Sequence, residues 1–156
     1  MSTPPREVRF RFLSQPTDVN WGGQVHGGMV MKWMDQAGYA CAVGWSGRYA
    51  VTASVGGMSF LVPIRIGDLV EVCARVILTG RSSMHIAVEV DSVDLRSQAR
   101  ARTTRCVMVF VALDEQGKPT PVPVWEPQTE GDRHLAAYAT KLRGVRDELD
   151  AGLDTA

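Results

Sequence analysis

The chain has 156 residues, of which 45% are hydrophobic, and it carries 17 basic and 17 acidic side chains. This length and composition are typical of one globular domain with a sizeable core, and they exclude a disordered or low-complexity chain. Because the formal net charge is zero, no overall field attracts nucleic acid or an anionic membrane, and we expect neither as a partner.

The cysteines and the N-terminus indicate the cellular compartment in which the protein is expected. Three cysteines, an odd number, cannot form a complete disulfide framework, and no His, Cys or acidic residues show metal-ligand spacing, so we expect free thiols and no metal. The N-terminus lacks the apolar segment of a signal peptide. No run reaches the roughly 18 apolar residues that a membrane span needs. The sequence therefore predicts a cytoplasmic protein.

Hydrophobic periodicity predicts the elements. Alternating residues predict a first strand over 7–13. Residues 27–44 are apolar on almost every helical face, which is typical of a helix buried inside a domain, and we expect Gly44 and Gly47 to end it. Further strands are predicted over 50–61, with a bulge at Gly56-Gly57, and over 69–79, 84–93 and 104–113.

The last part of the chain differs in character. In strand 84–93 the alternation places His85 on the outer face, where we expect it to be exposed. Residues 131–150 predict a charged C-terminal helix. The expected architecture is α+β, one long helix wrapped by a mainly antiparallel sheet, with a domain over residues 1–130 and a helical tail over 131–156.

The segment from Asp18 to Asp35 carries the candidate chemistry. His26 and the pair Gly27-Gly28 stand where a glycine-rich loop meets the helix, and the first N–H groups of a helix have no partner within it. Such an end attracts a carbonyl oxygen or a phosphate. Asp35 follows Gly28 by seven residues, two turns, and so returns to the same face. This arrangement is suited to the hydrolysis of an acyl compound.

Six pieces of sequence together resemble a known family. They are N-x-x-G-x-V-H-G-G-x-x-x-x-x-M-D (20–35), Val51-Thr52, Phe60 with Pro63, Gly67-Asp68, Gly80-Arg81-Ser82-Ser83 and F-V-A-L-D-x-x-G-K-P-x-P-V-P (110–123). In this order they resemble the hotdog-fold acyl-CoA thioesterases, most closely the brain-type acyl-CoA hydrolases and their short bacterial relatives. The resemblance covers about residues 8–124 and implies the hotdog fold. Gly56 departs from it, since relatives often carry an acidic residue there.

The resemblance implies hydrolysis of acyl-CoA to a carboxylic acid and coenzyme A by a homo-oligomer, at least a dimer and in relatives often a trimer of dimers. Asp35 would be the general base or the nucleophile. Asn20 of the opposite subunit would orient water or the thioester carbonyl. The start of the helix at Gly27-Gly28 would polarise that carbonyl. The turn of Arg81, Ser82 and Ser83 would contact coenzyme A, which is part of the substrate, so no separate cofactor is implied.

Other interpretations of the same residues stay open. Asp35 could pair with Lys32, Asn20 could only form an Asx turn, and His26 could cap the helix or take part in the chemistry. A basic cluster could reach the ribose phosphate of coenzyme A, although a charged, solvated strand edge is favoured; its members are Arg96, Arg100, Arg102 and Arg105. A non-hydrolysing acyl-CoA binder or sensor is the alternative function, and a hotdog hydratase is disfavoured because the His precedes the helix.

Overall fold

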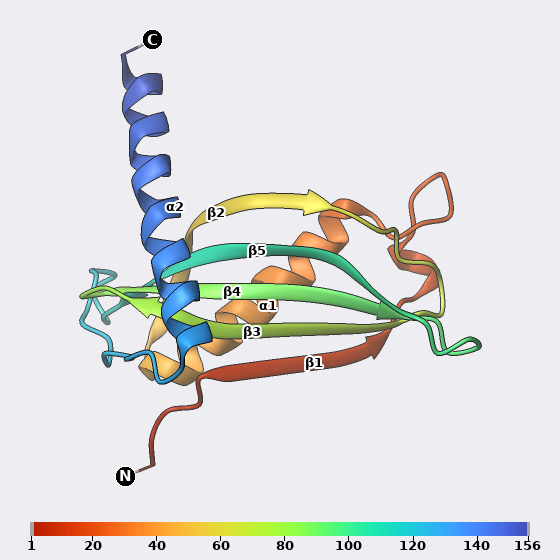
Figure 1. Ribbon diagram of the computed structural model, residues 1–156, viewed down its shortest axis with the longest axis horizontal. Helices are drawn as coiled ribbons and strands as arrows, with labels where there is room; N and C mark the ends of the chain where they lie inside the picture. The colour runs from red at the N-terminus through yellow and green to blue at the C-terminus, as the bar shows by residue number, and fades with distance from the viewer. Residues whose placement is uncertain (1, 156) are drawn as a thin grey trace.

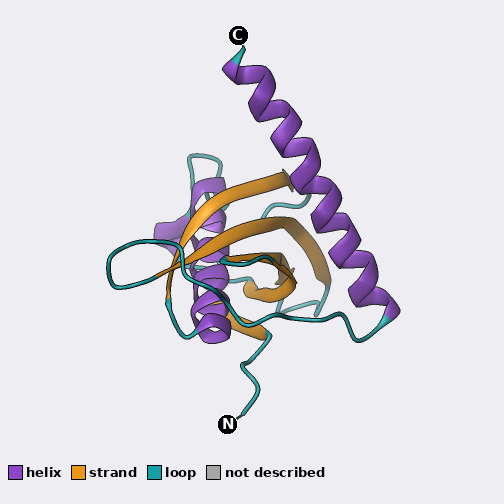
Figure 2. Ribbon diagram, turned by 90° about the vertical axis from the view of Figure 1, so that its left-hand side faces the viewer, coloured by secondary structure: helices purple, strands orange, loops and turns teal. Residues whose placement is uncertain are grey.

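The computed structural model describes residues 2–155 and shows an antiparallel sheet curled around one helix. The strands are β1 (Glu7–Leu13), β2 (Tyr49–Phe60), β3 (Leu69–Thr79), β4 (Ser83–Val93) and β5 (Arg100–Leu113). Their order in the sheet is β1-β3-β4-β5-β2, so β1 and β2 form its edges. Helix α1 (Gly27–Ser46) lies in the concave face, and α2 (Glu130–Asp154) crosses the outer face (Figures 1 and 2). This confirms the predicted α+β architecture.

Helix α1 is buried because the sheet encloses its apolar side chains. Met34 and Cys41 are fully buried. Gly38 lies against the sheet so closely that a Cβ there would come within 2.7 Å of the Phe110 ring, so a glycine is needed at this contact. The helix continues through Gly44, where we expected it to end. It ends at Gly47, whose left-handed backbone (φ 66°) forms the C-cap.

The predicted strands are confirmed, with shifts at their ends. The largest shift is in β5, which begins at Arg100 and not at residue 104. The inward side chains of the central strands pack on α1, and Val72, Val88 and Phe110 are at most 1% exposed. The predicted bulge is present, since the register between β2 and β5 shifts after Gly56.

Helix α2 adds a second layer on the outer face of the sheet. The helix contributes three apolar side chains to this contact, those of Leu135, Ala139 and Leu142. They pack on one outward side chain from each of β3, β4 and β5, namely Ile77, Ala87 and Val107. The prediction that His85 is exposed is wrong: it is 3% exposed because α2 lies over it. Burial, together with the charges of Arg143 and Arg146, lowers the pKa of His85 to about 4.

Two sets of hydrogen bonds hold the start of α2: one within its own capping box and one to Arg6 of the N-terminal segment. Thr129 and Asp132 form a capping box, in which the Asp132 N–H donates to Thr129 Oγ1 at 3.0 Å. The Asp132 carboxylate also accepts a hydrogen bond of 2.8 Å from Arg6, whose guanidinium lies 4.2 Å from the ring centre of Trp125. No helix among residues 2–155 is both long and apolar enough to span a membrane.

Candidate active site

The candidate site centres on Asp35, in the middle of α1, and on Thr52, in the edge strand β2. The Thr52 hydroxyl donates a hydrogen bond of 2.5 Å to Oδ1 of Asp35. Asp35 is half-buried, and Thr52 is exposed. The hydrogen-bond partner of the carboxylate is therefore a neutral hydroxyl on the sheet and not the ammonium group of Lys32.

An exposed apolar surface surrounds this carboxylate. Met31 and Tyr39, one turn before and one turn after Asp35, are 45% and 40% exposed. The Tyr39 ring meets the ring of Tyr49, at the start of β2, with 6.1 Å between the centroids. Asp35 thus lies between apolar side chains beside the free edge of the sheet, an environment suited to an acyl chain.

The start of α1 offers free hydrogen-bond donors. His26 is the N-cap; its N–H donates to the Asp18 carbonyl at 2.9 Å, and its carbonyl accepts from Val30 at 3.1 Å. The imidazole is exposed and forms no capping hydrogen bond within the described residues. The N–H groups of Gly27 and Gly28 find no acceptor in residues 2–155, as expected for the first turn of a helix.

A cavity of about 380 Å³ opens beside this helix start. It is lined by the first turn of α1, the loop before it and the segment after β2, through Gln24, Val25, Gly27, Val30 and residues 60–64. A Cβ at Gly27 would touch the Phe60 ring at 3.4 Å, whereas one at Gly28 would meet open space. The backbone at Gly28 is therefore accessible to a ligand oxygen.

Asn20 is exposed in the loop before α1. Its Oδ1 accepts hydrogen bonds from the backbone N–H groups of Gly22 and Gln24, at 2.9 and 3.3 Å. The Asx turn is therefore present, and because it holds only the amide oxygen, Nδ2 remains able to donate outward. Among the described residues, no hydrogen bond joins Asn20 to Asp35.

The turn proposed to bind coenzyme A lies far from the start of α1. The Gly80 N–H donates to the Ser83 carbonyl at 2.9 Å and closes the turn between β3 and β4, with Arg81 exposed. Ser83 pairs with Val111 of β5, whereas Phe60, next to Gly27, pairs with Thr104. Seven residues of strand separate these positions by about 23 Å, and Figure 1 shows them at opposite ends of the sheet.

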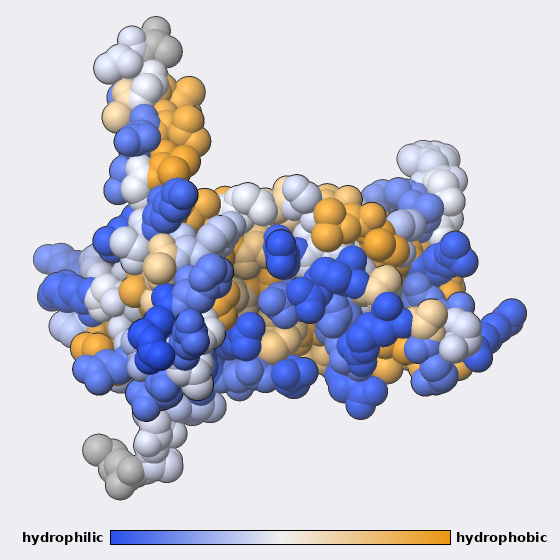
Figure 3. All heavy atoms as spheres, in the orientation of Figure 1, coloured by the Kyte–Doolittle hydropathy of each residue, from blue (hydrophilic) through white to orange (hydrophobic). Residues whose placement is uncertain are grey.

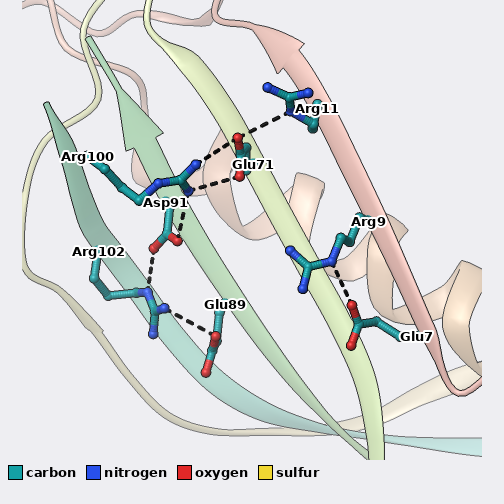
Figure 4. A network of polar contacts seen from close by, with 8 residues as sticks. All are labelled: Glu7, Arg9, Arg11, Glu71, Glu89, Asp91, Arg100 and Arg102. Atoms are coloured by element: carbon teal, nitrogen blue, oxygen red, sulfur yellow. Dashed lines mark hydrogen bonds and ion pairs between the residues drawn. The ribbon is translucent and has the colours of Figure 1, made fainter. Parts of the chain in front are cut away.

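The basic cluster at the start of β5 contributes to an ion-pair network on the outer face (Figure 4). Arg100 lies 2.9 Å from Glu71, and Arg102 lies 2.5 Å from Asp91 and 3.2 Å from Glu89. The hydrogen bond from Arg100 holds the pKa of Glu71 below its ordinary value. β2 pairs with β5 only from Thr104 to Leu113, so Arg100 and Arg102 lie on a stretch of β5 that β2 does not cover, and the interpretation as a charged strand edge stays a prediction. The two arginines neutralise carboxylates on the neighbouring strands.

Thr52 is the site residue to which the sequence assigned no role. The pair Val51-Thr52 contributed to the resemblance, but a strand pattern does not show which helix residue lies opposite it. The available signal was a hydroxyl side chain early in the strand that follows the buried helix. No group of three His, Cys, Asp or Glu side chains in residues 2–155 is placed to hold a metal ion.

Several relatives of the chain are acyl-CoA thioester hydrolases. The family model of the thioesterase superfamily matches residues 22–99. The acyl-CoA thioester hydrolase YciA of Salmonella typhimurium is 36% identical over 126 residues, which are 79% of this chain and 95% of that protein. The cytosolic acyl coenzyme A thioester hydrolase of Mus musculus is 38% identical over 124 residues, 78% of this chain but only 32% of that protein.

Solved structures agree with this assignment. A hexameric apo acyl-CoA thioesterase superposes with a TM-score of 0.89 at 34% identity over 93% of both chains. An acyl-CoA hydrolase from Staphylococcus aureus, in complex with butyryl coenzyme A and coenzyme A, gives 0.86 at 27% identity over 96% of this chain and 91% of that one. Alanine variants of one asparagine, one aspartate and one threonine of that enzyme have also been solved. The present chain belongs to the thioesterase superfamily, among the hotdog-fold acyl-CoA thioesterases.

Proposed function

We propose that the protein hydrolyses acyl-CoA to a carboxylic acid and coenzyme A at a site formed between two subunits, with Asp35 as general base. The observation that carries this proposal is the hydrogen bond from Thr52 to Asp35 on an exposed apolar face at the β2 edge. Because Thr52 holds Oδ1, Oδ2 remains to take a proton from water. A thioester carbonyl is already electrophilic, so activated water and a stabilised oxyanion suffice.

The distance along α1 from its start to Asp35 favours attack of water on the thioester carbonyl over direct attack by the Asp35 carboxylate. Seven residues of helix, from Gly28 to Asp35, rise about 10 Å, and helical side chains lean toward the N-terminus. A carbonyl oxygen that accepts from the Gly28 N–H leaves room for one water between the carbonyl carbon and the carboxylate. The partial positive charge of the helix end stabilises the developing oxyanion. The thiolate of coenzyme A then leaves.

The second subunit supplies Asn20. Asn20 is exposed and the Asx turn uses only its amide oxygen, so Nδ2 is able to donate across a subunit boundary. Asp35 lies beside the free edge of β2, where another copy can add its own β2 and continue the sheet. Asn20 then donates to the water or to the thioester carbonyl of the neighbouring site.

Features of three related proteins support these roles, the assembly and the location. In the Staphylococcus aureus enzyme, the substituted asparagine, aspartate and threonine are separated by 15 and 17 residues, and the same intervals separate Asn20, Asp35 and Thr52. The hexameric thioesterase that superposes on this chain supports a trimer of dimers as the assembly. A cytoplasmic location is in line with the cytosolic hydrolase of the mouse.

The coenzyme A end is proposed to bind at the turn of Arg81, Ser82 and Ser83. A guanidinium beside hydroxyl and backbone donors suits a phosphate. Since this turn lies about 23 Å along the sheet from the start of α1, a turn from another subunit is the better candidate for the nucleotide of a given site. Coenzyme A enters as substrate, and no other cofactor is needed.

Subunit complementation tests the proposal. Asp35→Ala and Asn20→Ala are each expected to release less than about 1% of the wild-type thiol. Random mixing of the two variants should restore about a quarter of the wild-type activity, because a two-fold dimer then rebuilds one site in four. Native mass spectrometry confirms that subunits have exchanged, and mixing Asp35→Ala with itself is the control.

Each other outcome has a distinct meaning. Full activity of Asp35→Ala would exclude the aspartate as base. Two inactive variants that exchange subunits but regain nothing would place Asn20 in its own subunit's site. A wild-type protein that binds coenzyme A but hydrolyses no acyl-CoA of any chain length would be an acyl-CoA binder.

A further inference from the structure

The apolar stripe of α2 continues beyond the part that packs on the sheet. Leu135, Ala139 and Leu142 lie against the outer face. The same helical face carries Val145, Leu149 and Leu153, which are 44%, 66% and 74% exposed. Figure 3 shows this apolar strip along one side of the projecting helix. A stripe that is buried at one end and exposed at the other indicates a missing neighbour.

The exposed end of the stripe lies past the edge of the sheet. Helix α2 crosses β2 and projects beyond it, in both views of the ribbon (Figures 1 and 2). Near the crossing, Arg146 donates a hydrogen bond of 2.7 Å to the Ser54 hydroxyl of β2. Leu149 and Asp150 still border the cavity between α2 and β2. We term residues 144–154 the overhang.

The overhang lacks the support that helices usually need. An isolated helical segment of this length is marginal in water, and most helices depend on tertiary packing of their apolar face. Leu149 belongs to neither buried apolar cluster of residues 2–155, and it borders the rest of the chain at the wall of that cavity. The apolar face of the overhang is therefore available for a surface that lies beyond β2.

A second copy of this chain is the partner that the geometry favours. The free edge of β2 is where the proposed function joins two subunits, and an added β2 would extend the sheet under the overhang. The charges are also complementary. The overhang is acidic, since it has one basic side chain, Arg146, and four carboxylates, at Asp147, Glu148, Asp150 and Asp154. The outer part of the sheet next to β2 carries an exposed basic side chain, Arg105, whose backbone pairs with Ser59 of β2.

We propose that the overhang of one subunit packs on the outer face of a second subunit beside its β2 and so clasps the two sheets together. Two-fold symmetry makes the contact reciprocal, so each subunit both gives and receives an overhang. The clasp would hold together the subunits whose residues form each site. This inference rests on the proposed function only for the choice of the β2 edge.

The test is self-association of the full-length chain. Leu149→Glu combined with Leu153→Glu places two charges on the apolar stripe, and Ala151→Glu places one on the opposite face of the same overhang. Sedimentation velocity over a dilution series should show the double variant dissociating at a concentration at least tenfold higher than the wild type. Ala151→Glu should match the wild type within about twofold. Circular dichroism verifies that each variant folds.

A photo-crosslinker at position 149 identifies the contact directly. Its expected products join two copies of the chain, with the second copy modified in β2 or β5. Equal association of the double variant and the wild type, or crosslinks confined to one copy, would overturn the proposal. Neither readout requires turnover, so a protein that associates through the overhang but hydrolyses nothing would refute the proposed function alone.

Discussion

The Thr52 hydroxyl and the Asp35 carboxylate lie 2.5 Å apart, although 17 residues and the whole second half of α1 separate them in the chain. The hydrogen bond joins the centre of the buried helix to the edge strand of the sheet. It restrains the carboxylate in one orientation, so the base is positioned before substrate arrives. It also ties the geometry of the site to β2, the strand at which a second subunit is proposed to bind.

Thr52→Val keeps the size of the side chain and removes its donor. We expect kcat to fall roughly 10- to 100-fold, because a hydrogen bond to a charged group contributes about 1.5–3 kcal/mol. KM for acyl-CoA should change little, since the hydroxyl acts through Asp35. Thiol release from a short-chain acyl-CoA measures both constants. Thr52→Ser, which retains the hydroxyl, should keep most of the activity; equal rates for the Val and wild-type enzymes would exclude this role.

Much of the fold could be predicted because each element has a periodicity of its own. The alternation of β3 and the all-round apolar pattern of α1 gave their positions to within a few residues. The end of α1 was harder, since both Gly44 and Gly47 are helix breakers, and only the left-handed backbone of Gly47 shows which one acts. His85 was misassigned because alternation identifies the outer face of a strand but not the helix that covers it.

The site was predictable to a smaller extent. The sequence was sufficient to predict that α1 starts at Gly27-Gly28 and that Asp35 lies on the same face two turns later, because both follow from local helix geometry. The contact between Asp35 and Thr52 depends on how β2 packs beside α1, which no local pattern encodes. The separation of Arg81 from the helix start depends on the strand register along β5. The role of Asn20 depends on a second subunit and stays a prediction.

Gly38→Ala tests the closest contact between α1 and the sheet. The added Cβ would meet the Phe110 ring at 2.7 and 2.9 Å, and overpacking of this kind costs about 1–3 kcal/mol of unfolding free energy. Gly44→Ala is the matched control: it lies in the same helix, and its Cβ would reach only Pro5, at 3.5 Å. There the higher helix propensity of alanine should stabilise the protein by up to about 1 kcal/mol. Urea unfolding that shows no loss for Gly38→Ala would contradict this contact.

Arg81→Ala tests the coenzyme A turn. We expect KM for acyl-CoA to rise about tenfold with little change in kcat, because an exposed guanidinium that contacts a phosphate contributes binding in the ground and transition states alike. The effect should vanish with acyl-pantetheine, which lacks the phosphates. Arg48→Ala, at another exposed arginine just after the end of α1, is the control. A KM increase that persists with acyl-pantetheine would show that Arg81 does not bind phosphate.

His85 should make the stability of the protein depend on pH. Burial under α2, beside Arg143 and Arg146, lowers its pKa from 6.5 to about 4, so between these values the unfolded chain binds a proton that the folded chain does not. Stability therefore falls as the pH decreases through this window, by on the order of 2 kcal/mol between pH 7 and pH 5. Urea unfolding at both pH values should show a smaller difference for His85→Gln than for the wild type. His134→Gln, at an exposed histidine of α2, should leave the wild-type difference intact. An unchanged difference in His85→Gln would mean that the imidazole already carries its proton beneath α2, or that other groups set the pH dependence.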